Sequence, residues 1–213
     1  SESTELGIKS FLFDRRVQLN AAYFINDYAG KQEESTQVDP ETKTVAAFWS
    51  NVAVAEYEGF EIDIQVLVNE YLRVFANYGT LDASYQGFFT DINASDGITK
   101  IESADFLTPR FAPEESWGIG GTLSVPIGSG TVDVFAKYNR IGEQETDLLN
   151  SDLARAPETE NLTASIGYYT DSWSITAYGT NLTDEQFEVV DPIMPLFAIG
   201  TINEGRKFGV ELT

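Results

Sequence analysis

Apolar and polar side chains alternate, with few exceptions, in nine separate stretches of this chain, and this alternation constrains the fold more than any other sequence feature. In Phe60–Val68, for example, every second residue is apolar, while Glu61 and Asp63 fall between. A period of two residues is typical of a β-strand with one apolar face and one polar face. The nine stretches are Leu6–Phe13, Val17–Tyr28, Phe60–Val68, Leu72–Leu81, Trp117–Val125, Val132–Asn139, Leu162–Tyr168, Trp173–Gly179 and Phe208–Leu212. The sequence therefore predicts an all-β fold of about nine meandering strands.

The connections between these stretches are short and long in strict alternation. The short ones lie at Asp14-Arg15, Asn69-Glu70, Ile127–Gly130 and Thr170–Ser172. The long ones are the polar segments Ala29–Ala53, Asp82–Glu115, Ile141–Glu160 and Leu182–Gly205. Outer-membrane barrels have this layout, with short turns on the periplasmic side and long loops outside. Because long loops without structure are uncommon in compact soluble domains, we expect an antiparallel transmembrane β-barrel segment.

The charged residues fit strands whose apolar register faces lipid. Asp27, Glu58 and Asp82 share the apolar register, but each lies at the long-loop end of its strand. An ionised side chain on the lipid face costs about 2–4 kcal/mol at the bilayer midplane and much less near the interfaces. The opposite register, which a wet lumen would solvate, holds Lys9, Glu61, Asp63, Arg73, Asp133, Lys137, Lys207 and Glu211. A soluble sandwich with one polar face would also place charges in that register, so the three acids are the better test.

Composition removes several classes of function. There are 34 acidic and 13 basic residues, and the formal net charge of −21 repels phosphate backbones, so nucleic acid is not expected as a partner. Cysteine and histidine are absent, which removes thiol nucleophiles, the usual zinc ligands and histidine acid–base chemistry. We expect no enzyme activity, no cofactor and no metal site. No apolar run approaches the roughly 18 residues that a transmembrane helix needs.

The strand count suggests that further strands belong to the same barrel. The first and the last predicted strand both run toward the short-turn side, and their number is odd. Bacterial single-chain barrels have an even number of strands, and an open sheet in lipid leaves two rows of unsatisfied backbone groups. We therefore expect residues 1–213 to be a partial β-barrel domain, with strands missing before its first residue.

Several motifs, in order along the chain, resemble those of TonB-dependent receptors. Glu5-Leu6-Gly7-Ile8-Lys9-Ser10 and Tyr23–Tyr28 are similar to two consecutive strands of that family. The most specific likeness is at the end, where Tyr178–Phe187 resembles the "yxxNLtDexY" motif before the last extracellular loop and Gly205–Val210 resembles the final strand. Further likenesses are Asn51-Val52-Ala53 with Glu58-Gly59-Phe60-Glu61, and Ala112-Pro113-Glu114-Glu115-Ser116.

The resemblance implies a barrel of twenty-two strands, of which this chain would supply the last nine and no plug domain. It implies active import of a scarce nutrient across the outer membrane of a Gram-negative bacterium, with an iron–siderophore as the first candidate and vitamin B12 or a glycan as others. Energy would come from TonB, ExbB and ExbD acting on an N-terminal plug outside this chain. The family usually continues a few residues beyond the position of Thr213, so we also expect residues missing at the C-terminus. The alternatives are a structural, adhesive or autotransporter-type outer-membrane barrel and a soluble β-rich binding module.

Four loop aromatics are the candidates for contact with a small-molecule ligand: Phe48, Trp49, Phe88 and Phe89. Exposed aromatic rings on loops need a partner for their apolar area. The alternative is that these rings pack among the loops or belong to extended strands. The acidic loops also suggest a hypothesis in which divalent cations bridge them to lipopolysaccharide, with outer-membrane lipid as the surrounding medium.

Overall fold

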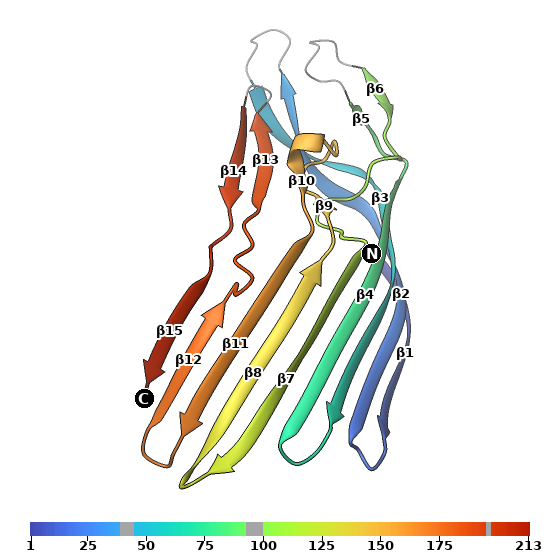
Figure 1. Cartoon of the computed structure of the whole chain (residues 1–213). Helices are drawn as coiled ribbons and strands as arrows, with labels where there is room; N and C mark the ends of the chain where they lie inside the picture. The colour runs from blue at the N-terminus through green and yellow to red at the C-terminus, as the bar shows by residue number, and fades with distance from the viewer. Residues whose placement is uncertain (39–44, 93–99, 195–196) are drawn as a thin grey trace.

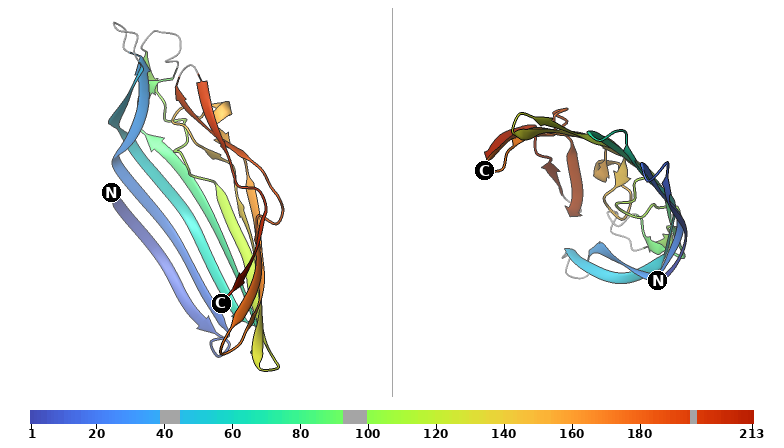
Figure 2. Two further views of the ribbon diagram at one scale, coloured as in Figure 1. Left: turned by 90° about the vertical axis from the view of Figure 1, so that its left-hand side faces the viewer. Right: turned by 90° about the horizontal axis from the view of Figure 1, so that it is seen from below.

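A single curved sheet dominates the computed structural model, which describes residues 1–38, 45–92, 100–194 and 197–213. Within the described residues the sheet has nine antiparallel strands, and each pairs with the next of the nine along the chain. The strands are β1 (Glu2–Leu12), β2 (Val17–Val38), β3 (Val45–Leu67), β4 (Leu72–Gln86), β7 (Glu115–Ile127), β8 (Gly130–Ile141), β11 (Thr159–Tyr169), β12 (Ser174–Thr180) and β15 (Lys207–Leu212). They form a tilted trough that is open along one side (Figures 1 and 2). The predicted nine-stranded antiparallel meander is thus confirmed.

The connections separate by length, as predicted. The tight hairpins β1–β2, β3–β4, β7–β8 and β11–β12 all turn at the lower end of the sheet in Figure 1, and the long connections gather at the upper end. At the β3–β4 turn the Asn69 carboxamide oxygen accepts the backbone N–H groups of Tyr71 and Leu72 at 2.8 and 2.9 Å. Such local acceptance of backbone N–H groups is the reason that Asn is frequent in tight turns.

The prediction of a long loop over Ala29–Ala53 is wrong, because most of this segment is strand. β2 continues to Val38 and β3 begins at Val45, and the two strands stay paired throughout, with register shifts near Lys31. The sequence does not show this extension, since residues 29–38 are mostly polar and lack alternation. The backbone hydrogen bonds of a ladder hold such an extension together, and they need no alternation of apolar and polar side chains.

The other long connections carry small elements. The β4–β7 connection holds β5 (Phe89–Asp91) and β6 (Ile101–Ser103), and the β8–β11 connection holds β9 (Gln144–Glu145), the 3₁₀ turn η2 (Asp152–Ala154) and β10 (Arg155–Ala156). The last connection holds β13 (Glu188–Met194) and β14 (Phe197–Ile202). In the described part of the chain no helix has the length and hydropathy needed to span a membrane.

Packing against the long connections identifies the inner face of the sheet. These connections fold over its concave side (Figure 2, right). Ala55 and Tyr85 are direct cross-strand partners on β3 and β4, and both pack against connection residues, so their register faces the concave side. Side chains alternate along a strand, so Glu61 and Asp63 also face inward, and Phe60 faces outward.

The outer, convex face is apolar. One row of cross-strand neighbours on this face consists of Leu72, Leu123, Val134, Ile166, Ala177 and Val210. Ile166, on the interior strand β11, is 54% exposed, which is unusual for an isoleucine inside a sheet. The predicted separation of apolar and charged registers is therefore confirmed in the pairing of the strands.

Phe24 interrupts the alternation of its own stretch, and the structure explains why. It faces inward on β2, directly opposite Gly59 of β3. A Cβ atom at Gly59 would lie only 2.5 Å from Phe24 Cζ, so the ring occupies the space that a side chain would fill. Aromatic rings often cover glycines on neighbouring strands in this way.

Candidate functional site

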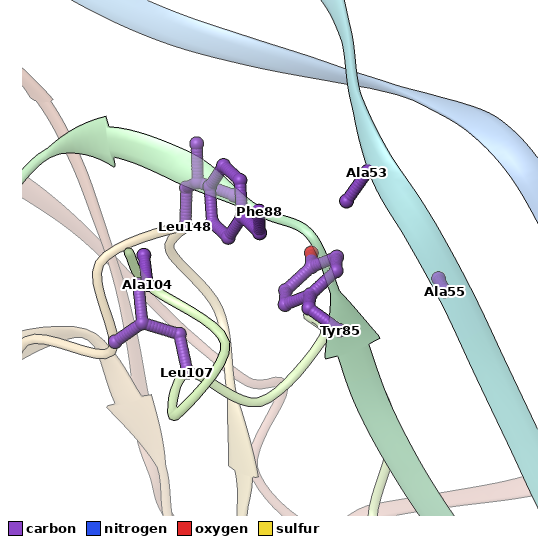
Figure 3. Close-up of a cluster of buried hydrophobic side chains, with 7 residues drawn as sticks. All are labelled: Ala53, Ala55, Tyr85, Phe88, Ala104, Leu107 and Leu148. Atoms are coloured by element: carbon purple, nitrogen blue, oxygen red, sulfur yellow. The ribbon is translucent and has the colours of Figure 1, made fainter. Parts of the chain in front are cut away.

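A small apolar cluster holds the long connections together above the sheet. It consists of Ala53, Ala55, Tyr85, Phe88, Ala104, Leu107 and Leu148, contributed by two strands and two connections (Figure 3). The Tyr85 and Phe88 rings lie with centroids 4.8 Å apart. Since the sheet itself has one strongly exposed face, this cluster is the principal buried core among the described residues.

Hydrogen bonds join the β4–β7 and β8–β11 connections to each other. The Thr108 N–H donates to Asn150 Oδ1 at 2.6 Å, and Asn150 Nδ2 donates back to the Thr108 carbonyl at 2.9 Å. The Phe111 N–H donates to the Glu145 carbonyl at 2.9 Å. The reciprocal bonds of one carboxamide satisfy a backbone donor and acceptor that have no sheet partner. The two connections therefore form one body.

A buried carboxylate ties this body to the β2–β3 hairpin. The Glu33 side chain is 2% exposed, and its two oxygens accept from Lys31 Nζ at 2.8 Å, Tyr85 Oη at 2.9 Å and Arg110 Nη2 at 2.5 Å. Burial by itself raises the pKa of the Glu33 carboxyl, but the three donors outweigh it and hold the pKa below its usual value. Burial beside this anion raises the pKa of the Tyr85 hydroxyl well above its usual range. Glu33 is therefore a charged centre onto which three segments converge.

The base of the loops carries a second set of ion pairs. Arg140, near the end of β8, bonds to both Glu115 and Glu158, which begin β7 and precede β11. The hydrogen bond from Arg140 lowers the pKa of the Glu158 carboxyl. These pairs join three neighbouring strands where they leave the sheet.

The inner wall below the loops carries several amide side chains among its charged groups. A row of cross-strand neighbours there consists of Asn20, Asp63, Asn77, Gly118, Asn139 and Asn161. A Cβ atom at Gly118 would lie 2.6 Å from Asn139 Oδ1 and 2.8 Å from Asn77 Oδ1, so the flanking amides close over this glycine. The wall is polar, as expected of the water-facing side of a barrel.

The four aromatics predicted to contact a ligand occupy different environments. Phe88 is fully buried in the apolar cluster, which matches the alternative of packing among the loops. Phe89, which begins β5, is 59% exposed, and Trp49 on the extended part of β3 is 67% exposed. Phe48 also belongs to β3, but its side chain lies outside what the structure describes. Ligand contact by these residues stays a prediction.

Two further exposed aromatics were missed. Phe106 is 70% exposed and Phe111 is 63% exposed, and both lie between β6 and β7. The criterion that selected Phe89, an aromatic ring on a polar connection, applies equally to them. They lie on the same connection as Phe89, so this connection exposes three aromatic rings, of which the sequence analysis had selected only Phe89.

A shallow pocket of about 480 Å³ lies on the convex side of β2, β3 and β4, in the register of Phe60. Its lining includes Glu58, Asp82 and Glu114, and the Tyr23 hydroxyl donates to Glu58 at 2.5 Å. Among the described residues no group of three or more acidic side chains is placed to hold a metal ion.

The curved meander, the apolar convex face, the polar inner wall and the loops gathered at one end define this protein as part of an outer-membrane-type β-barrel. The sequence profile of the family described as "TonB dependent receptor-like, beta-barrel" matches residues 1–182. The chain belongs to this family, the TonB-dependent receptors. No curated protein matches the sequence.

Solved structures of several receptors share the fold. The ferric yersiniabactin uptake receptor FyuA from Yersinia pestis superimposes with a TM-score of 0.74 at 18% identity, over 99% of this chain and 29% of that chain. The ferric-catecholate import receptor Fiu from E. coli K12 gives a TM-score of 0.68 at 19% identity, over 99% and 26%. The copper transporter OprC gives 0.67 at 13% identity, over 99% and 30%. The chain thus spans less than a third of the length of each of these three proteins.

Proposed function

We propose that this chain is part of an outer-membrane receptor that imports a scarce nutrient with energy delivered through TonB. The observation that carries the proposal is the match of residues 1–182 to the family, on a sheet with the curvature and loop layout of its barrels. In this proposal the energy arrives from TonB, ExbB and ExbD through an N-terminal plug. The role is transport rather than catalysis.

The convex face supports a location in the outer membrane of a Gram-negative bacterium. Its exposed apolar rows would be an aggregation hazard in water, whereas in a bilayer they meet lipid tails. Tyr168 and Trp173 lie at the short-turn end with ring centroids 5.5 Å apart, and the Tyr168 hydroxyl donates to the Ile127 carbonyl at 3.1 Å. Such rings suit an interfacial girdle, where an apolar body and a polar tip are both satisfied. Lipid and lipopolysaccharide are the proposed surroundings.

The proposed cargo is an iron–siderophore complex, with vitamin B12 or a glycan as alternatives. FyuA is a ferric yersiniabactin uptake receptor and Fiu a ferric-catecholate import receptor, which supports iron as the first cargo to test. The exposed rings of Trp49, Phe89, Phe106 and Phe111 are candidates for contact with the cargo. A packed loop body that holds its aromatics in place can bind a ligand at a smaller ordering cost than an unstructured loop.

Deletion of the complete reading frame in its host tests the proposal. We expect slower growth under iron limitation and loss of uptake of one ⁵⁵Fe-labelled siderophore from a panel, both restored by the intact frame. Deletion of ExbB should abolish the same uptake, because active import needs the energy supply.

A deletion strain that takes up every siderophore, vitamin B12 and each glycan tested at the wild-type rate would contradict the proposal. The same holds for uptake that persists fully without ExbB. Either result would favour the structural, adhesive or autotransporter-type barrel.

A further inference from the structure

The segment Ala104–Glu114, here called the strap, crosses from β6 to β7 without pairing in any sheet. Its inner side chains pack tightly, with Ala104, Leu107 and Pro109 buried. Between these lie Phe106 and Phe111, which are 70% and 63% exposed. The strap therefore has one packed side and one open side, although no β-ladder holds it in place.

Hydrogen bonds to Phe88, Asn150 and Glu145 fix the strap to its neighbours, and an ion pair adds a link to the β2–β3 hairpin. Arg110 Nη2 lies 2.5 Å from Glu33 Oε2, which joins the strap to a hairpin 77 residues away in sequence. Arg110 is 25% exposed, whereas Glu33 is 2% exposed. Loss of Arg110 contact would leave the buried Glu33 anion with Lys31 and Tyr85 as its donors. An ion pair whose anion is buried resists the removal of either partner, because the remaining charge stays uncompensated.

The backbone next to Arg110 is strained, and this strain disfavours the closed position of the strap. Phe111 follows Arg110 directly and has a φ of 57°, in the left-handed region that a bulky residue rarely adopts. Its N–H is nevertheless held by the Glu145 carbonyl at 2.9 Å. A strained residue next to an ion pair is the arrangement expected where a closed state is maintained by a specific contact and relaxes when that contact is lost.

We propose that the strap is a separately opening element, latched shut by the Glu33–Arg110 ion pair. In the closed state Leu107 lies in the apolar cluster with Phe88 and Leu148 (Figure 3). Opening withdraws Leu107 from that cluster and moves the exposed Phe106 and Phe111 together, while the β3–β4 ladder stays intact. This inference does not depend on the identity of the cargo.

Amide hydrogen exchange of the complete receptor in detergent micelles, without ligand, tests the latch. We expect the Ala104 and Leu107 amides to exchange faster than β3–β4 ladder amides in the wild type, since a separate opening has a lower free energy than global unfolding. Glu33→Gln removes the anion and should accelerate exchange in the strap by about tenfold or more, with the ladder unchanged. Arg110→Met removes the strap's side of the same ion pair and should give a comparable acceleration, because the link to the hairpin is lost in either variant. Arg110→Lys, which keeps the charge but not the guanidinium fork, should give the smallest.

Glu204→Gln is the matched control, because it removes an ion pair with Lys207 in which Glu204 is 80% exposed. It should leave exchange in the strap unchanged. The proposal is overturned if wild-type strap amides exchange only at the rate of the ladder, or if Glu33→Gln leaves their rate unchanged. If Glu33→Gln fails to assemble, equal strap exchange in Arg110→Met, Arg110→Lys and the wild type overturns it in the same way.

Discussion

At the scale of single residues, glycines and aromatics act as pairs in this sheet. Phe75 on β4 lies directly opposite Gly120 on β7, and a Cβ atom at Gly120 would lie 2.6 Å from Phe75 Cζ and 2.7 Å from the Ala136 carbonyl oxygen. The rings of Phe75 on β4 and Phe135 on β8 stack across β7, with centroids 6.4 Å apart. The glycine is required because the neighbouring ring and backbone leave no room for a side chain.

We expect Gly120→Ala to destabilise the barrel by about 1–3 kcal/mol, the usual cost of overpacking. The measurement is the temperature at which the complete receptor loses its heat-modifiable mobility in detergent gels. Gly79→Ala is the control, since a Cβ atom there would meet nothing closer than 3.7 Å. Equal midpoints for the two variants would show that the predicted crowding is absorbed without cost.

Also at the residue scale, Glu33 predicts a pH dependence of the loop body. Its pKa lies below the ordinary value of 4.5, so the folded state favours the anion and gains stability at pH values above 4.5. This contribution is lost as the pH falls below 4.5 and through the lowered pKa of the folded state. We therefore expect the equilibrium constant for opening of residues 104–111 to increase as the pH falls through that range. It is measured by amide exchange corrected for intrinsic rates. Glu33→Gln should flatten the dependence, and an unchanged profile in this variant would assign it to other groups.

At the scale of elements, the anchored turn after β12 shows how a loop is fixed at its root. Asn181 is 4% exposed and has a φ of 49°, which Asn tolerates better than most residues. Its Nδ2 donates to the carbonyls of Glu185 at 2.8 Å and Glu204 at 3.1 Å, and its Oδ1 accepts the Glu185 N–H at 3.1 Å. One carboxamide thereby joins both ends of the connection that carries β13 and β14.

Asn181→Asp should therefore loosen this connection. The substitution replaces two donors with a carboxylate facing two carbonyls, at a cost of about 1–3 kcal/mol for unsatisfied buried groups. We expect faster amide exchange at Glu185 and Asn203 with little change in β11. Asn161→Asp, at an exposed position whose amide oxygen accepts from Thr163, is the matched control. Similar exchange in both variants would mean that Asn181 is not the anchor.

At the scale of the whole molecule, the sheet separates two environments. Neighbouring residues on β7 test the separation directly, because Leu123 belongs to the convex apolar row and Thr122 to the inner register of Arg73. Leu123→Lys should cost about 2–4 kcal/mol if its side chain lies near the bilayer midplane, whereas Thr122→Lys faces water. We expect Leu123→Lys to reduce the amount of assembled receptor recovered from outer membranes. Equal recovery of both variants would place Leu123 outside the hydrocarbon region.

The sequence by itself determined the nine strands, their order, the separation of their two faces and the segregation of short turns from long connections. It could do so because one face meets an apolar medium and the other a polar one, which imposes a period of two residues on every strand. Only the tertiary structure decided that β2 and β3 continue as a paired hairpin past Tyr28 and Val54, since backbone pairing leaves no alternating pattern there. It also decided that Phe88 is buried while Phe89 is exposed, and that Glu33 meets Arg110. Those contacts join residues far apart in sequence, and no local periodicity records them.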